Sequence, residues 1–569
     1  MFHDTLVSFA ERRIIKMKKT LRRALAVFMT ASLLFTLVAC GDSGDGKVAA
    51  GREEGSLIFN VDWPAYIDPG VGSKLADALA HTNMYDSLTF PNEDGTVEPL
   101  ACESWSVNDN STEYTFALRK GMKFHSGNEV KASDVKFSFD RLIALGEGYA
   151  YLFSDVKSCD VIDDYNVKFR LNAPSGIFPM IACRIYILDE ALVMENITDG
   201  AYDKYGDYGK AWLNTNDAGS GPYKVKEMIT ESSLTMERFE DYWKGWDDAK
   251  DAPKTAKMLG NVAASTVKTM ISRGELDITD DTQTPEALEV LNSMDGVTVI
   301  RALSGVNFNV CLNTKSAPTD DIHVRRAMAY AVDYDTVCNN IYVGSSVPTG
   351  PIVRALTASA LDESEFPFTY DLEKAKKEIE ESKYYNDLIS GKRKITLSYC
   401  SEGGEQQEKL ALLIQAGMSK LGVTVEVAGK PFATMMSEAA EVKTTPNAAF
   451  VVFAPTYLEG GGYLYSRYHS NSAGTWEQME WLQNKNIDKE ITNAMRTADD
   501  KSRNEQYKKI SKEIVELCPT LWVADLASPY AYRSDYVTKF PAAEKYEAGT
   551  PAANMTGYHL YLRNIGVAQ

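Results

Sequence analysis

The chain has 569 residues, of which 44% are hydrophobic and 24% charged, and this composition excludes disordered, collagen-like and coiled-coil proteins. The length exceeds what one hydrophobic core supports, so two large lobes or several domains are expected. The 60 basic and 79 acidic residues give a net charge of −19, which argues against nucleic-acid binding, and six histidines argue against a histidine-rich metal site.

The first 39 residues are predicted to be an export signal. Basic residues at 18, 19, 22 and 23 precede residues 24–39, which carry no charge at all. An apolar stretch of this length is short for a membrane span and typical of the core of a signal peptide. Met17 is the alternative start of translation, which would leave residues 1–16 as an extension.

Cys40 ends this apolar stretch and is predicted to be lipidated. Leu37-Val38-Ala39-Cys40-Gly41 resembles a bacterial lipobox, in which the cysteine thiol receives diacylglycerol before cleavage. Residues 40–55 are polar and glycine-rich, so we predict a flexible tether. The mature protein is then expected outside the cytoplasm, held by lipid to the outer face of the cytoplasmic membrane or in the periplasm.

The body of the protein is more acidic than the whole chain. Without the seven basic and two acidic residues of 1–39, 53 basic and 77 acidic residues remain, a net charge of −24. Besides Cys40 there are seven scattered cysteines and no Cys-x-x-Cys pair, so neither a zinc nor a redox motif is indicated, and any disulfide stays open.

Helical and strand patterns alternate along this body. Residues 114–118 alternate apolar and polar side chains, which predicts a strand. Residues 405–421 place apolar side chains on one helical face, Gly422 ends the helix, and residues 423–427 read as a strand. Asp371 is expected to cap a further helix. A helix followed by a β-branched strand, repeated, favours the α/β class.

One long run of sequence carries a family signature. Residues 97–109 contain Pro99-Leu100-Ala101 and Ser104-Trp105, and residues 114–127 contain Phe116, Arg119-Lys120-Gly121 and Phe124-His125. This run resembles the peptide/nickel class of ABC-transporter substrate-binding proteins, solute-binding family 5. Shorter matches follow in family order at 219–225, 234–243, 273–278, 324–333 and 420–423. His125 lies in a turn and is interpreted as structural.

The resemblance implies an α/β, two-lobed clam of the periplasmic-binding-protein type (class II, large type with an extra subdomain in lobe I). Lobe I is expected at 56–305 and 526–569, and lobe II at 306–525. Ligand would lie between the lobes, and closure about the hinge would bury it. The closed form would then dock on the permease subunits of an ABC importer.

Peptide-binding members of this family commonly hold the peptide amine with an Asp in a lobe II loop after a hydrophobic strand. The corresponding loop here follows residues 448–453 and has no Asp; Glu459 is the nearest acid, Gly460–Gly462 replace the usual residues, and Arg467 is a candidate for a carboxylate. Asn307 and Asn309 lie at the expected hinge. The predicted ligand-binding residues are Trp63, Tyr66, Asn307, Asn309, Tyr457, Glu459, Gly461, Tyr463, Tyr465 and Arg467.

The predicted function is capture of an oligopeptide, a dipeptide or a similar polar solute, by a monomer without cofactor, metal or catalytic residues. The tyrosine-rich loop keeps an oligosaccharide-binding receptor open as an alternative. A sensory lipoprotein that binds peptide signals without import is an alternative of another class. A metal chelate is less favoured, and no hydrolase or phosphate-loop motif supports an enzyme.

Overall fold

The computed structural model describes residues 52–260, 262–550 and 555–569. The predicted signal peptide, Cys40 and the tether up to residue 51 lie outside this range. Within it, no helix has the length and apolar character needed to cross a membrane.

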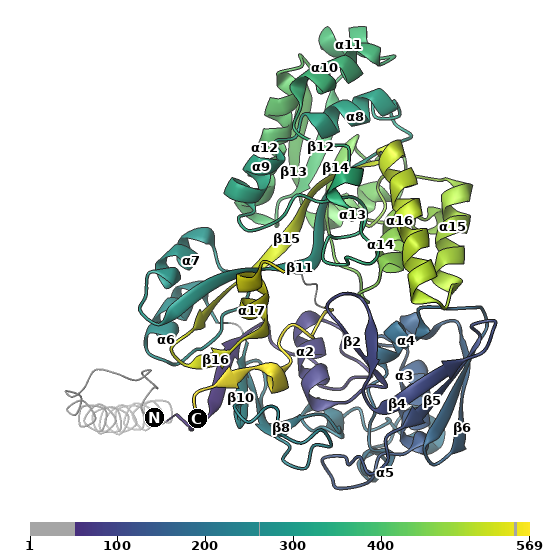
Figure 1. Cartoon of the computed structure of the whole chain (residues 1–569), viewed down its shortest axis with the longest axis vertical. Helices are drawn as coiled ribbons and strands as arrows, with labels where there is room; N and C mark the ends of the chain where they lie inside the picture. Colours follow the sequence, from purple (N-terminus) through teal and green to yellow (C-terminus); the bar gives the residue numbers. More distant parts are fainter. Residues whose placement is uncertain (1–51, 261, 551–554) are drawn as a thin grey trace, which may run out of the picture. The chain divides into compact units, whose positions relative to one another are not determined.

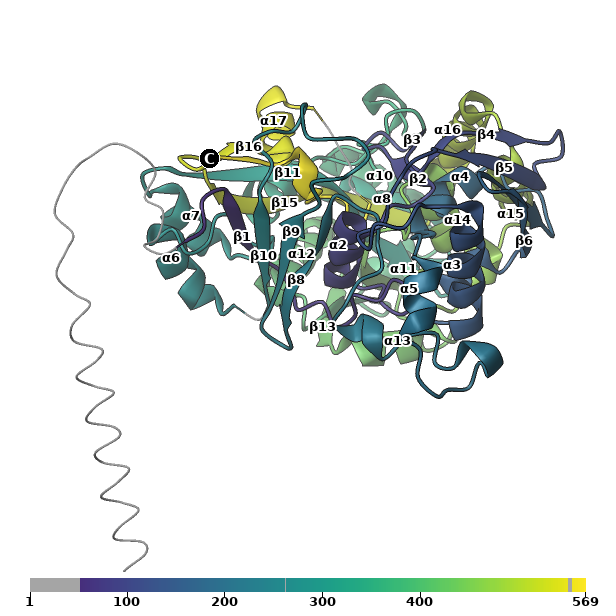
Figure 2. The ribbon, with the colours of Figure 1, turned by 90° about the horizontal axis from the view of Figure 1, so that it is seen from below.

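A mixed four-stranded sheet and several flanking helices build the main part of lobe I (Figure 2). Its first two strands are parallel and the other pairs antiparallel. In sheet order the strands are β1 (Ser56–Asn60), β10 (Thr255–Leu259), β9 (Ser233–Arg238) and β8 (Tyr223–Ile229). The accompanying elements are α2 (Leu75–Met84), α6 (Ala264–Ser272), α7 (Pro285–Asn292), α17 (Pro541–Ala548), β16 (Val537–Lys539) and β17 (Gly566–Val567).

The signature run forms a separate antiparallel sheet with its own hydrophobic core. The predicted strand at 114–118 is confirmed as the central part of β5. In sheet order the strands are β4 (Cys102–Val107), β5 (Glu113–Leu118), β7 (Asn166–Leu171) and β6 (Val156–Asp163). Around them lie β2 (Thr89–Pro91), β3 (Val97–Pro99), α3 (Ala132–Leu145), α4 (Phe178–Ile181) and α5 (Glu190–Glu195).

His125 is a structural residue, as the sequence predicts. Its Nδ1 lies 2.5 Å from Asp217 Oδ1 and its Nε2 lies 2.9 Å from the carbonyl oxygen of Gly221. Although burial acts to raise the pKa of Asp217, the neighbouring His125 and two backbone N–H donors hold that pKa below its ordinary value. The histidine therefore joins the turn after β5 to the segment that precedes β8.

Lobe II is built on a five-stranded mixed sheet and carries the largest hydrophobic core. In sheet order the strands are β13 (Val425–Lys430), β12 (Ile395–Cys400), β14 (Ala448–Phe453), β11 (Val297–Leu312) and β15 (Thr520–Arg533). The helices are α8 (Ile322–Tyr330), α9 (Tyr334–Thr336), α10 (Leu372–Glu381), α11 (Tyr385–Ile389), α12 (Gly404–Ser419), α13 (Phe432–Ala439), α14 (Gly460–Tyr468), α15 (Lys485–Arg496) and α16 (Asp500–Leu517).

The predicted helix at 405–421 is confirmed as α12, and Gly422 adopts the left-handed conformation (φ 78°) that follows it. The strand predicted at 423–427 is β13, which begins two residues later. Asp371 caps α10, because its carboxylate accepts a hydrogen bond from the Lys374 backbone N–H at 3.0 Å.

The long strands β11 and β15 connect the lobes and form what we call the ribbon (Figure 1). They pair antiparallel from Val297 to Leu303 and again from Asn307 to Cys311, with an irregularity in register between these stretches. β14 pairs with β11 only from Asn307 onward, so residues 304–306 pair with neither strand. The expected lobe boundary at 305/306 falls in this interruption and stays a prediction.

His81 in α2 makes stability depend on pH. Its side chain is fully buried, its Nε2 lies 3.0 Å from the Tyr66 carbonyl oxygen, and burial lowers its pKa to about 4. The unfolded chain, with an ordinary histidine pKa near 6.5, therefore binds more protons between pH 6.5 and 4. The contribution is complete above pH 6.5 and is lost as the pH falls toward 4.

We expect about 2–3 kcal/mol of unfolding free energy to be lost between pH 7 and 4.5 through His81. The His81→Gln variant keeps a donor for the Tyr66 carbonyl and does not titrate, so its stability is expected to fall less over this range. Urea unfolding of both proteins at the two pH values measures the difference. Equal losses in both proteins would contradict the assignment to His81.

Candidate functional site

A cavity of about 270 Å³ lies against the ribbon at its interruption, and we call it the ribbon cavity. Residues 302–306 of β11 and Ser528 and Tyr530 of β15 form one wall. Three segments far apart in sequence complete the cavity. They are the stretch before α7, which contributes Asp281, the loop after β14, and the C-terminal segment. The lining includes Asp281, Gly305, Ser528, Tyr530 and His559.

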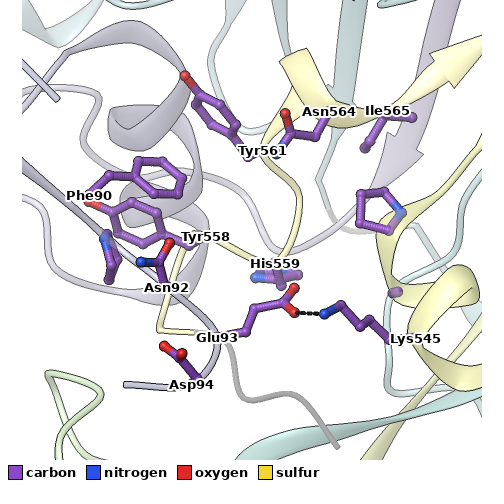
Figure 3. Close-up of a pocket in the computed structure, with 13 residues that line it drawn as sticks. Phe90, Asn92, Glu93, Asp94, Lys545, Tyr558, His559, Tyr561, Asn564 and Ile565 are labelled. Atoms are coloured by element: carbon purple, nitrogen blue, oxygen red, sulfur yellow. Dashed lines mark ion pairs between the residues drawn. The ribbon is translucent and has the colours of Figure 1, made fainter. Parts of the chain in front are cut away.

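A second cavity of about 360 Å³ adjoins the first (Figure 3). Ala542 and His559 line both cavities. The rings of Phe90, Tyr558 and Tyr561 lie on one side of this second cavity. An ion pair of 3.3 Å joins Glu93 to Lys545 across it. The two charges of this ion pair therefore neutralise each other. The three aromatic rings form the main apolar surface of the second cavity.

Three side chains set the chemistry of the ribbon cavity. Asp281 is half-buried, and its Oδ2 accepts a hydrogen bond from the Ser528 hydroxyl at 3.0 Å. Burial lowers the pKa of His559 below its ordinary value although Asp281 opposes this, so the ring is neutral at pH 7. The ring is nearly parallel to that of Tyr530, with 6.4 Å between centroids. The site therefore combines one carboxylate with a neutral aromatic wall.

The lobe II segment predicted to be a ligand-binding loop is partly helical. Its last nine residues form α14, and Glu459 caps this helix by accepting a hydrogen bond from the Gly461 backbone N–H at 2.6 Å. The three glycines are therefore the first turn of a buried helix, rather than a flexible turn. A Cβ on Gly461 would lie 2.5 Å from the Tyr507 hydroxyl oxygen, so close packing against α16 requires glycine at this position.

Glu459 is fully engaged within the protein. Its Oε1 accepts from Arg503 Nε at 2.9 Å and its Oε2 accepts from the Tyr507 hydroxyl at 3.1 Å, and the residue is 3% exposed. The predicted contact of Glu459 with a ligand amine stays untested. The geometry gives it a structural role instead, because an ammonium would have to displace a buried guanidinium.

Arg467 is likewise satisfied inside lobe II. It is completely buried, pairs with Glu480 at 2.5 Å, and donates to the backbone carbonyl of Glu477. A ligand carboxylate cannot reach this guanidinium without opening the core, so its predicted role as a carboxylate receptor is at odds with the structure. The sequence shows the arginine but not the partner 13 residues later.

The tyrosines of the same segment have different surroundings. The hydroxyl of the buried Tyr463 donates to the Gly305 carbonyl oxygen at 2.5 Å and so ties α14 to the interruption of the ribbon. Tyr465 stacks on His469 with 4.4 Å between ring centroids. Tyr457 is half-buried and packs against the cores of both lobe II and the signature sheet.

The remaining predicted residues lie on the ribbon and after β1. Asn307 and Asn309 are buried, and Asn309 Nδ2 donates to Asn307 Oδ1 at 2.8 Å. Trp63 is half-buried against Gly260, and Tyr66 is 42% exposed. None of the ten predicted residues lines the ribbon cavity, so the structure does not gather them there.

Asp281, Tyr530 and His559 were missed by sequence reasoning. Asp281 stands three residues after the family motif at 273–278, and this proximity is the signal that could have found it. Tyr530 and His559 reach the cavity only through the pairing of β15 and the path of the C-terminal segment.

Contacts between the predicted lobes lie beside the loop after β14. The Tyr151 hydroxyl donates to Thr456 Oγ1 at 2.9 Å, and the Gly176 backbone N–H donates to the Met495 carbonyl oxygen at 2.8 Å. These bonds join the part of lobe I that contains the sheet β4–β5–β7–β6, which we call the signature subdomain, to lobe II. The lobes therefore touch at points other than the ribbon.

Comparisons with known proteins agree with this architecture. The family model "Bacterial extracellular solute-binding proteins, family 5 Middle" matches residues 96–475. The probable D,D-dipeptide-binding periplasmic protein DdpA of Escherichia coli (strain K12) is 26% identical over 481 residues, 83% of this chain and 87% of the relative. The dipeptide-binding protein DppE of Bacillus subtilis (strain 168) is 25% identical over 531 residues, 85% of this chain and 90% of the relative.

A solved structure extends the agreement to the fold. The ABC transporter substrate-binding protein CtaP of Listeria monocytogenes superposes with a TM-score of 0.74 at 21% identity, covering 91% of this chain and 100% of that one. At this identity the likeness concerns the fold alone. The predicted α/β fold with two lobes is thereby confirmed.

Proposed function

This chain belongs to family 5 of the bacterial extracellular solute-binding proteins, and from this premise we propose that it captures a short peptide between its lobes for an ABC importer. The observation that carries the proposal is the lining of the ribbon cavity, to which both lobes and the ribbon contribute residues. A ligand bound there stabilises the arrangement in which it contacts both lobes. The relatives whose names specify dipeptides support a peptide as the solute.

The wall of the cavity suits a peptide backbone. Residues 304–306 of β11 have no strand partner, but the Gly305 carbonyl oxygen accepts from the Tyr463 hydroxyl and the Val306 N–H donates to Ser304 Oγ at 3.3 Å. An extended peptide would add here as a strand through the other backbone groups of this stretch. The aromatic second cavity next to it provides space for an apolar side chain. An oligosaccharide receptor remains the second candidate, because the aromatic residues Phe90, Tyr558 and Tyr561 line the second cavity and sugars stack on aromatic rings.

A thermal-shift screen separates these two candidates. A pool of tripeptides at about 100 times the dissociation constant would stabilise the folded state by about 2.7 kcal/mol and raise the unfolding midpoint by several degrees. An oligosaccharide pool is the matched control and is expected to leave the midpoint unchanged. Stabilisation by the oligosaccharides alone would contradict the proposal that the ligand is a peptide.

The protein acts, on this proposal, as a lipid-anchored monomer that presents peptide to permease subunits. A sensory role without import predicts no uptake defect on deletion of the gene. Loss of growth on peptides as the sole source of a required amino acid, restored by the wild-type gene, supports import. Unchanged peptide uptake in the deletion strain would favour the sensory role.

Lipidation at Cys40 is tested separately. The Cys40→Ala variant is expected to incorporate no labelled fatty acid, because the acceptor thiol is gone, and to appear in the soluble fraction after export. Cys102→Ala is a matched control that leaves the lipobox intact and should be labelled like the wild type. Undiminished labelling of Cys40→Ala would refute the lipobox.

A further inference from the structure

The start of α8 and the last turn of α10 bring one histidine and two glutamates together on lobe II. His323 Nδ1 lies 2.7 Å from Glu378 Oε2 and 3.6 Å from Glu381 Oε2. Among the residues that the structure describes, this is the one group of three or more His, Cys, Asp or Glu side chains whose ligand atoms all lie within 4.8 Å of one another. None of the three lines the ribbon cavity or the second cavity, so the cluster is separate from the site described above.

Both helices are fixed where these side chains begin. Asp321 caps α8 by accepting a hydrogen bond from the His323 backbone N–H at 3.1 Å. The same carboxylate accepts from the Ser382 hydroxyl at 2.8 Å, directly after the end of α10. Ile379, in the last turn of α10, is buried in the lobe II core. The two helix ends are therefore joined by groups other than the cluster, and its three side chains start from fixed backbone positions.

The negative charge of this cluster exceeds what its histidine can balance. In the described part of the chain, neither Glu378 nor Glu381 forms an ion pair with a lysine or an arginine. Two basic side chains of the same helices are engaged elsewhere. Arg326 donates to a backbone carbonyl oxygen of α16 at 3.0 Å, and Lys374 pairs with Asp371 at 3.4 Å. A protonated imidazole compensates one of the two carboxylate charges, whereas a divalent cation compensates both.

The ligand types and their spacing suit zinc. Zinc binds imidazole nitrogen and carboxylate oxygen at about 2.0–2.2 Å, so two ligand atoms of a tetrahedral ion lie about 3.3 Å apart. The distances of 2.7 and 3.6 Å from His323 Nδ1 lie on either side of this value, so small side-chain rotations are enough. Magnesium and calcium prefer oxygen ligands alone. The His323 side chain is 32% exposed and that of Glu381 is 51% exposed, which leaves access for the ion and for water.

We propose that His323 Nδ1, Glu378 and Glu381 bind a zinc ion, with water as the fourth ligand. The ion links the start of α8 to the end of α10 at the surface of lobe II. The sequence expectation of no metal depended on the small number of histidines, and a site of this composition needs only one. Zinc binding at this place is independent of peptide capture, because the cluster lines neither cavity.

Isothermal titration with zinc chloride tests the proposal on protein that has been freed of metal with EDTA. Wild-type protein is expected to bind one zinc ion with a dissociation constant of about 10 μM or below, weaker than the closed four-ligand sites of zinc fingers. His323→Asn and Glu378→Gln each remove one ligand. Each is expected to weaken zinc binding at least about ten-fold, because loss of a residue that merely supports a ligand commonly costs about 10–100-fold.

Glu380→Gln is the matched control. Glu380 lies on the same helix next to Glu381, its side chain is exposed, and it does not belong to the cluster. Its replacement removes the same charge and is expected to change zinc affinity by less than about two-fold, since exposed charges interact weakly in water. Magnesium chloride in excess is expected to leave bound zinc in place. Thermal unfolding of each variant establishes that it is folded.

Two kinds of result would overturn the zinc site. One is the absence of zinc binding to folded wild-type protein, or wild-type affinity in folded His323→Asn. The other is equal weakening in Glu380→Gln, or displacement of zinc by magnesium, because the acidic surface would then attract cations without a specific site. Either result leaves peptide capture standing, since the thermal-shift screen with tripeptides tests that proposal separately.

Discussion

Arg467→Gln is expected to lower the free energy of unfolding by about 3–5 kcal/mol, because it leaves Glu480 as an uncompensated buried charge. The backbone carbonyl of Glu477 would also lose its guanidinium donor. Urea unfolding followed by tryptophan fluorescence measures the loss. This expectation differs in kind from the sequence prediction, in which the same arginine holds a ligand carboxylate and its loss affects affinity alone.

Two controls distinguish these readings. The double variant Arg467→Met with Glu480→Met removes both charges and is expected to cost less than Arg467→Gln, since no charge stays unpaired. Lys136→Met breaks the surface pair with Asp140 and is expected to change stability by less than about 1 kcal/mol. An Arg467→Gln protein of wild-type stability with weakened peptide binding would restore the sequence prediction.

Gly176→Ala is expected to weaken ligand binding by at least about ten-fold. A Cβ on Gly176 would lie 1.9 Å from the Thr497 carbonyl oxygen, so the contact between the signature subdomain and lobe II must open. Gly176 does not have the left-handed backbone that only glycine favours, so alanine introduces no strain within its own loop. A ligand that needs both lobes then binds a less populated arrangement, and its apparent affinity falls with that population.

Titration with the tripeptide pool measures this effect. Ser175→Ala changes the adjacent residue without a new contact of this kind, and its affinity is expected to stay within about two-fold of the wild type. Small-angle scattering should show Gly176→Ala as the more extended protein. Wild-type affinity in Gly176→Ala would mean that the contact at Gly176 is not coupled to binding.

Local sequence patterns predicted much of the fold. The alternation at 114–118, the apolar face of α12 and the cap at Asp371 depend on neighbours within a few residues, and all three are present in the structure. The lobe II segment 454–468 is predicted to be a loop from the family resemblance, yet its residues 460–468 form α14, although glycine disfavours helices. Burial against Tyr507 overrides that preference, since only glycine fits there.

The candidate site was harder to predict, because its charges are balanced by residues distant in sequence. Glu459 was the nearest acid to the missing Asp, but its partner Arg503 lies 44 residues further along the chain. Asp281 is not distinguished in the sequence, because nothing there shows that an acid lacks a partner. That property emerges only when the segment at 278–281 is laid beside β15.

The unpaired stretch 304–306 has a mechanical consequence. These residues line the cavity and also belong to the strand that connects the lobes. A ligand held there lies where the two lobes join, so a small change in the backbone of this stretch changes the angle between the lobes. Binding in the ribbon cavity would thereby be expressed as a change in the relative orientation of the lobes, at surfaces distant from the ligand.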